Sequence, residues 1–253
     1  MGRGRRQLAV AGIQFTLRAS AAALGEPLRE GLDDVLGDVL GSFIPSAEPE
    51  PADSEQAFFE MAPSGEATKF HADAAGMRIQ VAADDPGPGL RGMLVTALDR
   101  RGSALLHGAG VVIAGGAVLC IAPSEGGKTT LCGKLAGRVP ILSDETVALR
   151  LDGVQPLLAG TFFWSGPALP TSAELFPLRA VCFLRKGSVG LFPLPGAVAL
   201  QELLLEWHLP ERPGAAEAAL ARAAALLAHL PSFTLHTTLD ADPLPLLTQA
   251  AEG

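Results

Sequence analysis

The sequence predicts a protein of the α/β or α+β class, in which helices flank a mixed sheet and a small α+β segment precedes it. From about residue 93 onward, short apolar runs bounded by glycines indicate strands, and periodic or alanine-rich stretches indicate helices. The predicted strands are 105–114, 117–121, 139–142, 178–184 and one around Phe233 and Leu235; the predicted helices run from Lys128 to about Ala136, over 197–208 and over 214–230.

The first part of the chain has a different pattern. Residues 8–18 predict a strand, because Ile13, Phe15 and Leu17 alternate with polar residues as in a half-buried strand. Residues 27–44 predict an amphipathic helix that starts at Pro27. A proline-rich connection follows at 46–56, and Met77, Ile79 and Val81 alternate as in a short strand. The Pro/Gly-rich stretch 84–92 reads as a loop or boundary. We therefore expect a small α+β segment at 1–90 and a larger domain at 91–253.

Composition narrows the functional classes. The 253 residues are 48% hydrophobic, which is enough for a sizeable core, and the net charge is −8, which argues against a nucleic-acid binder. No uncharged apolar run is long enough to cross a membrane, and Arg18 interrupts the apolar stretch near the N-terminus, so neither a membrane span nor a secretory signal is expected. The three cysteines have no metal-type spacing, and we expect reduced core thiols in a cytoplasmic protein.

A glycine-rich loop at 122–130 carries the clearest functional signal. Two apolar strands joined by Gly115-Gly116 predict a hairpin, and the second strand leads directly into Ala122-Pro-Ser-Glu-Gly-Gly-Lys-Thr-Thr130. This segment matches the Walker A pattern G-x-x-x-x-G-K-[ST], except that Ala122 replaces the first glycine. Such a loop directs backbone N–H groups and a helix N-terminus at phosphate, so we expect it to bind a nucleoside triphosphate.

Each residue type in this Gly-rich loop suits a role in binding ATP and Mg²⁺. Lys128 would neutralise the β- and γ-phosphates, and the Thr129 hydroxyl would hold the metal. Glu125 lies inside the loop, where a carboxylate directed at phosphate would weaken binding and one directed outward would not. The candidate nucleotide-binding residues are Ser124, Gly126, Gly127, Lys128, Thr129 and Thr130.

An acidic pair follows the next predicted strand. Asp144 comes 16 positions after Lys128, which leaves room for one short helix and one strand. In transporter ATPases and most GTPases the acidic strand comes much later, so the spacing argues against those classes. Beside a phosphoryl-transfer site, Asp144 and Glu145 can hold Mg²⁺ or accept the proton of an attacking hydroxyl. The alternative interpretation is a solvated strand end. His107, before the hairpin, is a further candidate catalytic residue, although a lone histidine on a strand is more often structural.

These residues together resemble the HPr kinase/phosphorylase family, whose nucleotide-binding fold is that of phosphoenolpyruvate carboxykinase. The resemblance rests on Leu106-His107-Gly108, the hairpin, Ser124-x-Gly-Gly-Lys-Thr129 and Ser143-Asp144-Glu145, and it covers about 103–150. A weaker likeness, over 160–162 and 177–184, is to short stand-alone HPr-kinase-like proteins, some of which are encoded beside genes for modified peptides. Residues 1–90 show no match to the family's regulatory domain.

The resemblance implies a kinase and assigns roles by position. Lys128 would bind the β/γ-phosphates, Thr129 the metal, and His107 would lie near the metal and the transferred phosphoryl group. Asp144 matches the first of two aspartates that serve as base and metal ligand in the family. The acceptor would be a Ser or Thr hydroxyl of a protein or peptide, or a small-molecule hydroxyl, and a homo-oligomer is a candidate assembly because HPr kinases form hexamers.

The chain departs from the family pattern at two positions. Glu125 replaces a glycine of the loop, and Glu145 replaces the second aspartate, which keeps the charge but moves the carboxylate outward by one methylene. These changes leave open a second hypothesis, a catalytically weak ATP-binding sensor or scaffold in a biosynthetic cluster. No phosphorylase signature follows, so kinase action is expected rather than dephosphorylation. A third hypothesis, an unrelated ATPase or GTPase, is opposed by the acidic spacing.

Overall fold

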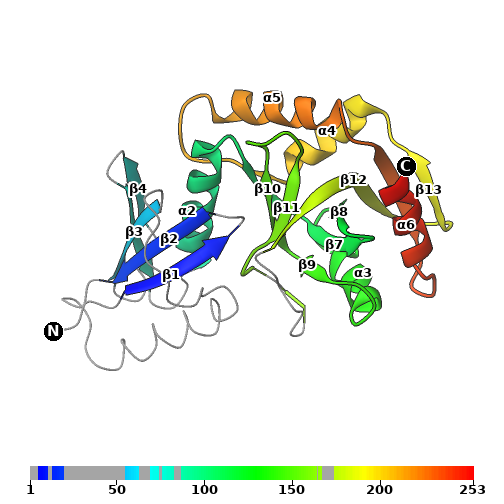
Figure 1. Ribbon diagram of the computed structural model, residues 1–253, viewed down its shortest axis with the longest axis horizontal. Coiled ribbons are helices and arrows are strands. Elements are labelled where there is room, and N and C mark those ends of the chain that lie inside the picture. The colour runs from blue at the N-terminus through cyan, green and yellow to red at the C-terminus, as the bar shows by residue number, and fades with distance from the viewer. Residues whose placement is uncertain are drawn as a thin grey trace.

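The computed structural model describes residues 5–10, 13–19, 55–62, 69–73, 76–82, 87–163, 165–166 and 174–253. The predicted helix at 27–44 lies outside this part of the chain. The described residues contain mixed α and β structure, with a ten-stranded mixed sheet flanked by helices and a separate five-stranded sheet (Figure 1). This agrees with the predicted class.

The five-stranded sheet comes from the N-terminal part of the chain. Its strands are ordered β1-β2-β3-β5-β4. The single strand expected at 8–18 is wrong: β1 and β2 pair antiparallel, with Val10 opposite Ile13. The stretch Leu8-Ala-Val-Ala-Gly-Ile13 stays apolar or small through the reversal, so the pattern did not reveal it. The alternation around Met77 is confirmed within β5. The strands are β1 (Arg5–Val10), β2 (Ile13–Ala19), β3 (Glu55–Ala62), β4 (Lys69–Asp73) and β5 (Gly76–Ala82).

A helix, α2 (Gly87–Arg100), follows the first sheet and corrects the loop expected at 84–92. Pro88 falls in its first turn, where the N–H that proline lacks has no intrahelical partner in any case. Leu90, Met93 and Leu94 are buried, and this apolar face holds the helix despite its glycines. The helix packs against both β5 and β6, so it lies across the division expected at residue 90, which stays a prediction.

The ten-stranded sheet contains the remaining strands, and its main path is β14-β6-β10-β11-β12-β8-β7-β9. β8 pairs parallel with β12, which pairs parallel with β15. In chain order, these strands and the helices that flank them are β6 (Ala104–His107), β7 (Ala109–Ile113), β8 (Gly116–Ile121), α3 (Lys128–Leu135), β9 (Ile141–Ser143), β10 (Thr146–Arg150), β11 (Leu157–Gly160), β12 (Leu175–Lys186), β13 (Gly190–Pro193), α4 (Gly196–Leu205), β14 (Trp207–His208), α5 (Ala215–Leu227), β15 (Ser232–Thr237) and α6 (Leu244–Glu252).

The hairpin across Gly115-Gly116 is confirmed. β7 and β8 pair antiparallel. Ala114 and Gly115 have φ of 49° and 78°. These are the left-handed values that a tight hairpin turn requires. The strand expected at 105–114 is interrupted at Gly108 and forms β6 and β7. A Cβ at Gly108 would lie 3.0 Å from the Ile121 side chain and 3.2 Å from the Cys120 carbonyl oxygen, so the close approach of this bend to β8 favours glycine.

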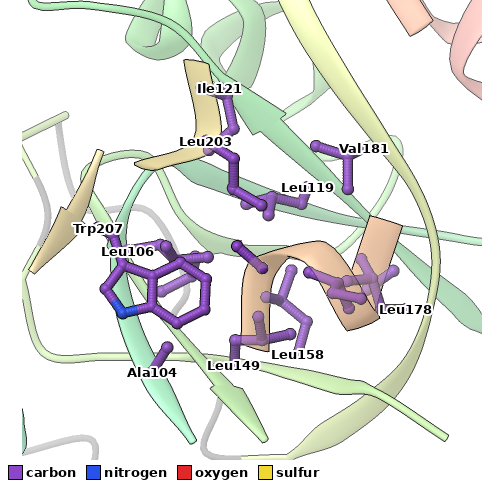
Figure 2. Packing of buried hydrophobic residues seen from close by; sticks show 14 of the residues in the cluster. Ala104, Leu106, Leu119, Ile121, Leu149, Leu158, Leu178, Val181, Leu203 and Trp207 are labelled. Carbon is purple, nitrogen blue, oxygen red and sulfur yellow. The ribbon is translucent and has the colours of Figure 1, made fainter. Parts of the chain in front are cut away.

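The helix expected at 197–208 ends earlier. α4 stops at Leu205, and Trp207 belongs to β14, which pairs with β6. Figure 2 shows the Trp207 indole beside Leu106, inside the core. Trp207 is only 7% exposed, so its side chain packs in the core and does not form a surface for a partner. Four elements of this larger part of the chain were not predicted at all: β10, β11, β13 and α6.

Two apolar clusters fill the space on either side of β8. Leu119 and Ile121 point into one cluster with α4 and α5, and Val118 and Cys120 point into the other with α3 and α6 (Figures 1 and 2). This period-2 division is what a strand buried on both faces requires. The cysteines Cys120, Cys132 and Cys182 are all buried and unbridged in the second cluster. No helix in the described ranges has the length and apolar character needed to cross a membrane.

Shortening a buried side chain of β8 tests this arrangement. Leu119 is fully buried. Leu119→Ala is therefore expected to lower the free energy of unfolding by about 2–5 kcal/mol, measured by urea denaturation. Leu239, which is 79% exposed, provides the matched control. Its alanine variant should stay within about 0.5 kcal/mol of wild type, as surface substitutions usually do. Equal effects of the two substitutions would contradict the two-sided burial of β8.

Candidate functional site

The Gly-rich loop connects the end of β8 at Ile121 to the start of α3 at Lys128. The Lys128 side chain folds back over the loop, where its Nζ donates hydrogen bonds to the carbonyl oxygens of Ala122 at 2.6 Å and Pro123 at 3.2 Å. These bonds tie the two ends of the loop together. The loop backbone and the first turn of α3 therefore surround one ammonium group, which is 6% exposed as a residue.

Two glycines are required by the loop's geometry. Gly127 has φ 99°, a left-handed value that disfavours side chains. A Cβ at Gly126 would lie 2.6 Å from the Ala122 methyl and 2.8 Å from the Pro123 carbonyl oxygen, which is too close for any side chain. Ala122, which replaces the first glycine of the motif, is accommodated because its methyl group is buried in the core and faces a residue without a Cβ.

Glu125 is exposed and has φ 61°, one of two non-glycine residues with positive φ in the described part of the chain. A β-carbon in the left-handed region crowds the following carbonyl and costs about 1–2 kcal/mol. The family pattern has a glycine here, and the observed conformation gives that preference a physical reason. The loop keeps its shape with a glutamate, but it stores strain at this residue.

The acidic pair occupies the turn between β9 and β10. The Ser143 hydroxyl shapes this turn: it donates to the Phe163 carbonyl at 2.7 Å and accepts from the backbone N–H groups of Glu145 and Thr146, both at 3.1 Å. Asp144 is buried at 1% exposure. The turn thereby holds a buried carboxylate beside the Gly-rich loop.

The two carboxylates have different partners. Asp144 Oδ1 accepts from the Ser165 backbone N–H at 2.9 Å, and Oδ2 accepts from the Ser165 hydroxyl at 3.1 Å. Glu145 Oε1 pairs with Arg91 Nη2 at 3.1 Å, and both side chains are about a third exposed or less. Arg91 also lies over the Phe163 ring, 4.6 Å from its centroid. The ion pair therefore fixes Glu145 toward α2, while the hydrogen bonds of Asp144 go to a serine.

His107 lies beside the acidic pair because β6 and β10 are paired there. It is opposite Thr146, and the N–H of Gly108 donates to the Glu145 carbonyl at 2.9 Å. Burial and the positive charge of Lys128 lower the pKa of His107, with Glu145 opposing the shift. The imidazole is therefore neutral at pH 7 and can accept or donate a hydrogen bond.

All nine residues expected from the sequence meet in one cavity of about 200 Å³. It lies at the N-terminus of α3, and Glu125 and Ser165 complete its lining. The nine are His107, Ser124, Gly126, Gly127, Lys128, Thr129, Thr130, Asp144 and Glu145.

Carboxyl groups surround the charge of Lys128 inside the site. Burial lowers the pKa of its ammonium, and the negative charges of Glu206, Asp144 and Glu145 oppose that shift. Glu206 lies at the end of α4, where burial raises the pKa of its carboxyl and Lys128 opposes this. The site thus holds one buried cation among three carboxyl groups, so a nucleotide bound here would need a divalent cation to offset the excess of negative charge.

A second cavity of about 670 Å³ adjoins the first on the other side of residues 124–126. Its apolar lining includes Ile121, Leu184 and Leu205, and its charged lining includes Lys186 and Glu206. Arg185 also lines this cavity and pairs with Glu202. The two cavities share Ser124, Glu125 and Gly126, so a ligand held by the Gly-rich loop has room to extend.

The sequence did not identify Ser165, Arg91 or Glu206 as residues in or beside the site, nor His208, whose Nε2 lies 3.5 Å from Arg91 Nη1. Arg91 falls within the stretch expected to be a loop, and Glu206 and His208 within the helix expected at 197–208. Ser165 had no distinguishing pattern around it. These residues reach the site through sheet pairing and helix packing between parts of the chain that are far apart in sequence. The local sequence does not reveal such long-range packing.

The oxygen donors suit a hard divalent cation. The hydroxyl of Thr129 and the carboxylate of Asp144 flank the same Ser165 hydroxyl, at 3.2 and 3.1 Å, so two of the three expected metal ligands face a common point, while the third, Glu145, pairs with Arg91. Among the described residues, no three His, Cys, Asp or Glu side chains gather into a metal-binding group. Mg²⁺ in nucleotide sites is commonly held by one or two carboxylates together with substrate phosphates and water, and the residues present fit that mode.

Comparison with known proteins gives no further assignment: no family model matches the chain, and no curated protein matches it either. The likeness to HPr kinases therefore remains a resemblance in the motifs.

The strain at Glu125 predicts an effect on stability. Glu125→Gly should be more stable than Glu125→Ala by about 1 kcal/mol, because alanine keeps the β-carbon that the left-handed backbone disfavours. Urea denaturation of both variants measures this difference, and since both remove the carboxylate, charge does not enter it. Equal stabilities would mean that residue 125 does not have this backbone conformation in solution.

His208 predicts a pH dependence. Burial, followed by the positive charges of Arg91 and His107, lowers its pKa from 6.5 to about 4. The unfolded chain therefore binds more protons between these values, so the free energy of unfolding should fall as pH falls from about 6.5 toward 4. His208→Gln should show a shallower fall, measured by denaturation across that range. An unchanged slope would contradict the burial of a neutral His208.

Proposed function

We propose that the protein is an ATP- and Mg²⁺-dependent kinase that transfers the γ-phosphoryl group to a hydroxyl. The acceptor is a Ser or Thr of a protein or peptide, or a small-molecule hydroxyl. One observation carries the proposal: the buried Asp144 carboxylate accepts a hydrogen bond from a hydroxyl in the same cavity as Lys128 and Thr129. A carboxylate, a hydroxyl and a phosphate-binding lysine are the groups that this transfer requires.

Phosphate binding is supported by the loop and the helix. A strand, a glycine-rich turn and a helix N-terminus direct backbone N–H groups and a partial positive charge at the small cavity. Within the described residues, the Lys128 ammonium donates to two carbonyl oxygens there, so phosphate oxygens can take their place as acceptors without breaking an ion pair. Mg²⁺, when bound with the nucleotide near Thr129 and Asp144, would further neutralise the phosphates.

Proton transfer is assigned to Asp144. As the acceptor oxygen bonds to the γ-phosphorus, the bond from that phosphorus to the β–γ bridging oxygen breaks, ADP leaves with the electron pair, and Asp144 takes the hydroxyl proton. Lys128 would stabilise charge on the moving group. His107, neutral at pH 7 and part of the same cavity, would hydrogen-bond it. Glu145 forms an ion pair with Arg91, so we assign the role of base to Asp144 and not to Glu145.

The two adjoining cavities support binding of more than phosphate. The cavity of about 200 Å³ has room for phosphates, and the cavity of about 670 Å³ has room for a nucleoside or an acceptor next to them. We place this activity in the cytoplasm, with a protein, peptide or small-molecule partner, no nucleic-acid partner, and a homo-oligomer as the candidate assembly. The motif resemblance to HPr kinases supports the same reaction class.

A second candidate function is a catalytically weak ATP-binding sensor or scaffold. It is favoured by the strained Glu125 within the loop and by the Arg91–Glu145 ion pair, which engages one of the two acids. The two candidates share nucleotide binding and differ in phosphoryl transfer.

The first test is binding of ATP with Mg²⁺ by isothermal calorimetry. Lys128→Ala should weaken binding at least about tenfold, because it removes the buried cation. Lys134→Ala is the matched control, since Lys134 lies in the same helix but contacts the carbonyls of Thr238 and Ala241 outside the cavity. Absence of binding by wild type, or equal binding by Lys128→Ala, would refute the proposal.

The second test separates the kinase from the scaffold. Asp144→Asn should still bind ATP, but transfer from γ-labelled ATP to an acceptor found by screening peptides and small molecules should fall about 10²–10⁴-fold. Transfer at the wild-type rate would exclude Asp144 as the base. ATP binding by wild type without transfer to any acceptor would favour the sensor or scaffold.

A further inference from the structure

We propose that Ser165 is a self-phosphorylation site, at which the chain transfers the γ-phosphoryl group of its own bound ATP to its own hydroxyl. The inference rests on the proposed function and adds a covalent modification site to it. It starts from one contact: Ser165 Oγ donates a hydrogen bond to Asp144 Oδ2 at 3.1 Å. This is the contact that an acceptor hydroxyl makes with its base before transfer.

The serine is oriented and not merely near. Its backbone N–H donates to the other oxygen of the same carboxylate at 2.9 Å, so two bonds to Asp144 fix both its backbone and its hydroxyl. Its hydroxyl also lies 3.2 Å from the Thr129 hydroxyl, at the start of α3. The nucleophile thus lies between the base and the phosphate-binding helix.

The chain that leads to Ser165 is anchored to the acidic turn. Thr161 Oγ1 donates to the Thr146 carbonyl at 2.7 Å, and the Phe163 carbonyl accepts from Ser143 Oγ at 2.7 Å. Both partners lie within two positions of Asp144 in the sequence. Thr161 and Phe163 are buried, whereas Ser165 itself is exposed and lines the small cavity, so the hydroxyl is accessible to a nucleotide.

The step balances without a further reactant beyond ATP. A bond forms between Ser165 Oγ and the γ-phosphorus, the bond from that phosphorus to the bridging oxygen breaks, and ADP leaves with the electron pair. The Ser165 proton goes to Asp144 Oδ2 and then to water. The product is a phosphoserine with a charge of about −1.5 to −2 beside Asp144 and Lys128. Because it occupies the cavity that ATP needs, we expect the modification to stop at one group per chain and to reduce later ATP binding.

The test is incubation of the full chain with γ-labelled ATP and Mg²⁺, read by intact mass and by peptide mapping of the labelled residue. One phosphoryl group on Ser165 is the expected result. Ser165→Ala should lose the label, and Ser165→Thr should carry it on the threonine. Asp144→Asn should slow labelling about 100-fold or more. Ser188→Ala is the matched control, because Ser188 is exposed and lies outside the cavity, and it should label as wild type does.

Intramolecular transfer has its own signature. The rate constant of labelling should be independent of protein concentration, and wild type should not label the Lys128→Ala chain. A rate that rises with concentration, label on another residue, or label that persists in Ser165→Ala would overturn the inference. Lys128-dependent ATP binding by calorimetry with no label on Ser165 would overturn it while leaving the proposed function standing. No ATP binding would instead mean that the proposed function had failed.

Discussion

The pairing of two chain segments, 104–113 and 141–150, determines the positions of His107 and the acidic pair in the candidate site. β6 pairs with β10 on one side of a bend, and β7 pairs with β9 on the other, so His107 is opposite Thr146 and Gly110 is opposite Ser143. Gly108 and the Asp144-Glu145 turn lie at the bend between these pairs. Without this pairing, His107 and the acidic pair would not face the Gly-rich loop, which extends from the neighbouring strand β8.

The rest of the fold supports that bend from both sides. β8 is buried on both faces, between α4 and α5 on one side and α3 and α6 on the other, so the loop that follows it starts from a fixed point. Segment 161–163 is bonded to the turn through Thr161 and Phe163, and α2 contributes Arg91. The cavity is therefore bordered by elements from separate parts of the chain, each anchored by core packing or by hydrogen bonds.

Within the cavity, the two acids differ because their surroundings differ. Glu145 is paired with a guanidinium that also lies over Phe163, which fixes the direction of its side chain. Asp144 is buried, and its two oxygens accept hydrogen bonds from Ser165 instead of pairing with a guanidinium. Lys128, with its pKa lowered by burial and supported by three nearby carboxyl groups, supplies the positive charge. These different partners support the proposal that Asp144, and not Glu145, acts as the base.

The sequence by itself determined the local features. Gly115-Gly116 allows a hairpin turn, the run from Ala122 to Thr130 forms a strand-to-helix loop, and Asp144 follows a short buried strand; each depends on neighbours within a few positions. It missed α2, because Pro88 and Gly89 suggested a loop while the burial that stabilises the helix comes from distant strands. It also failed to divide the strands at Val10 and Gly108, since apolar and small residues continue through the reversal and through the bend. Only the tertiary structure decided that Arg91, Glu206 and Ser165 join the site, because sheet pairing and helix packing act between residues far apart in the chain.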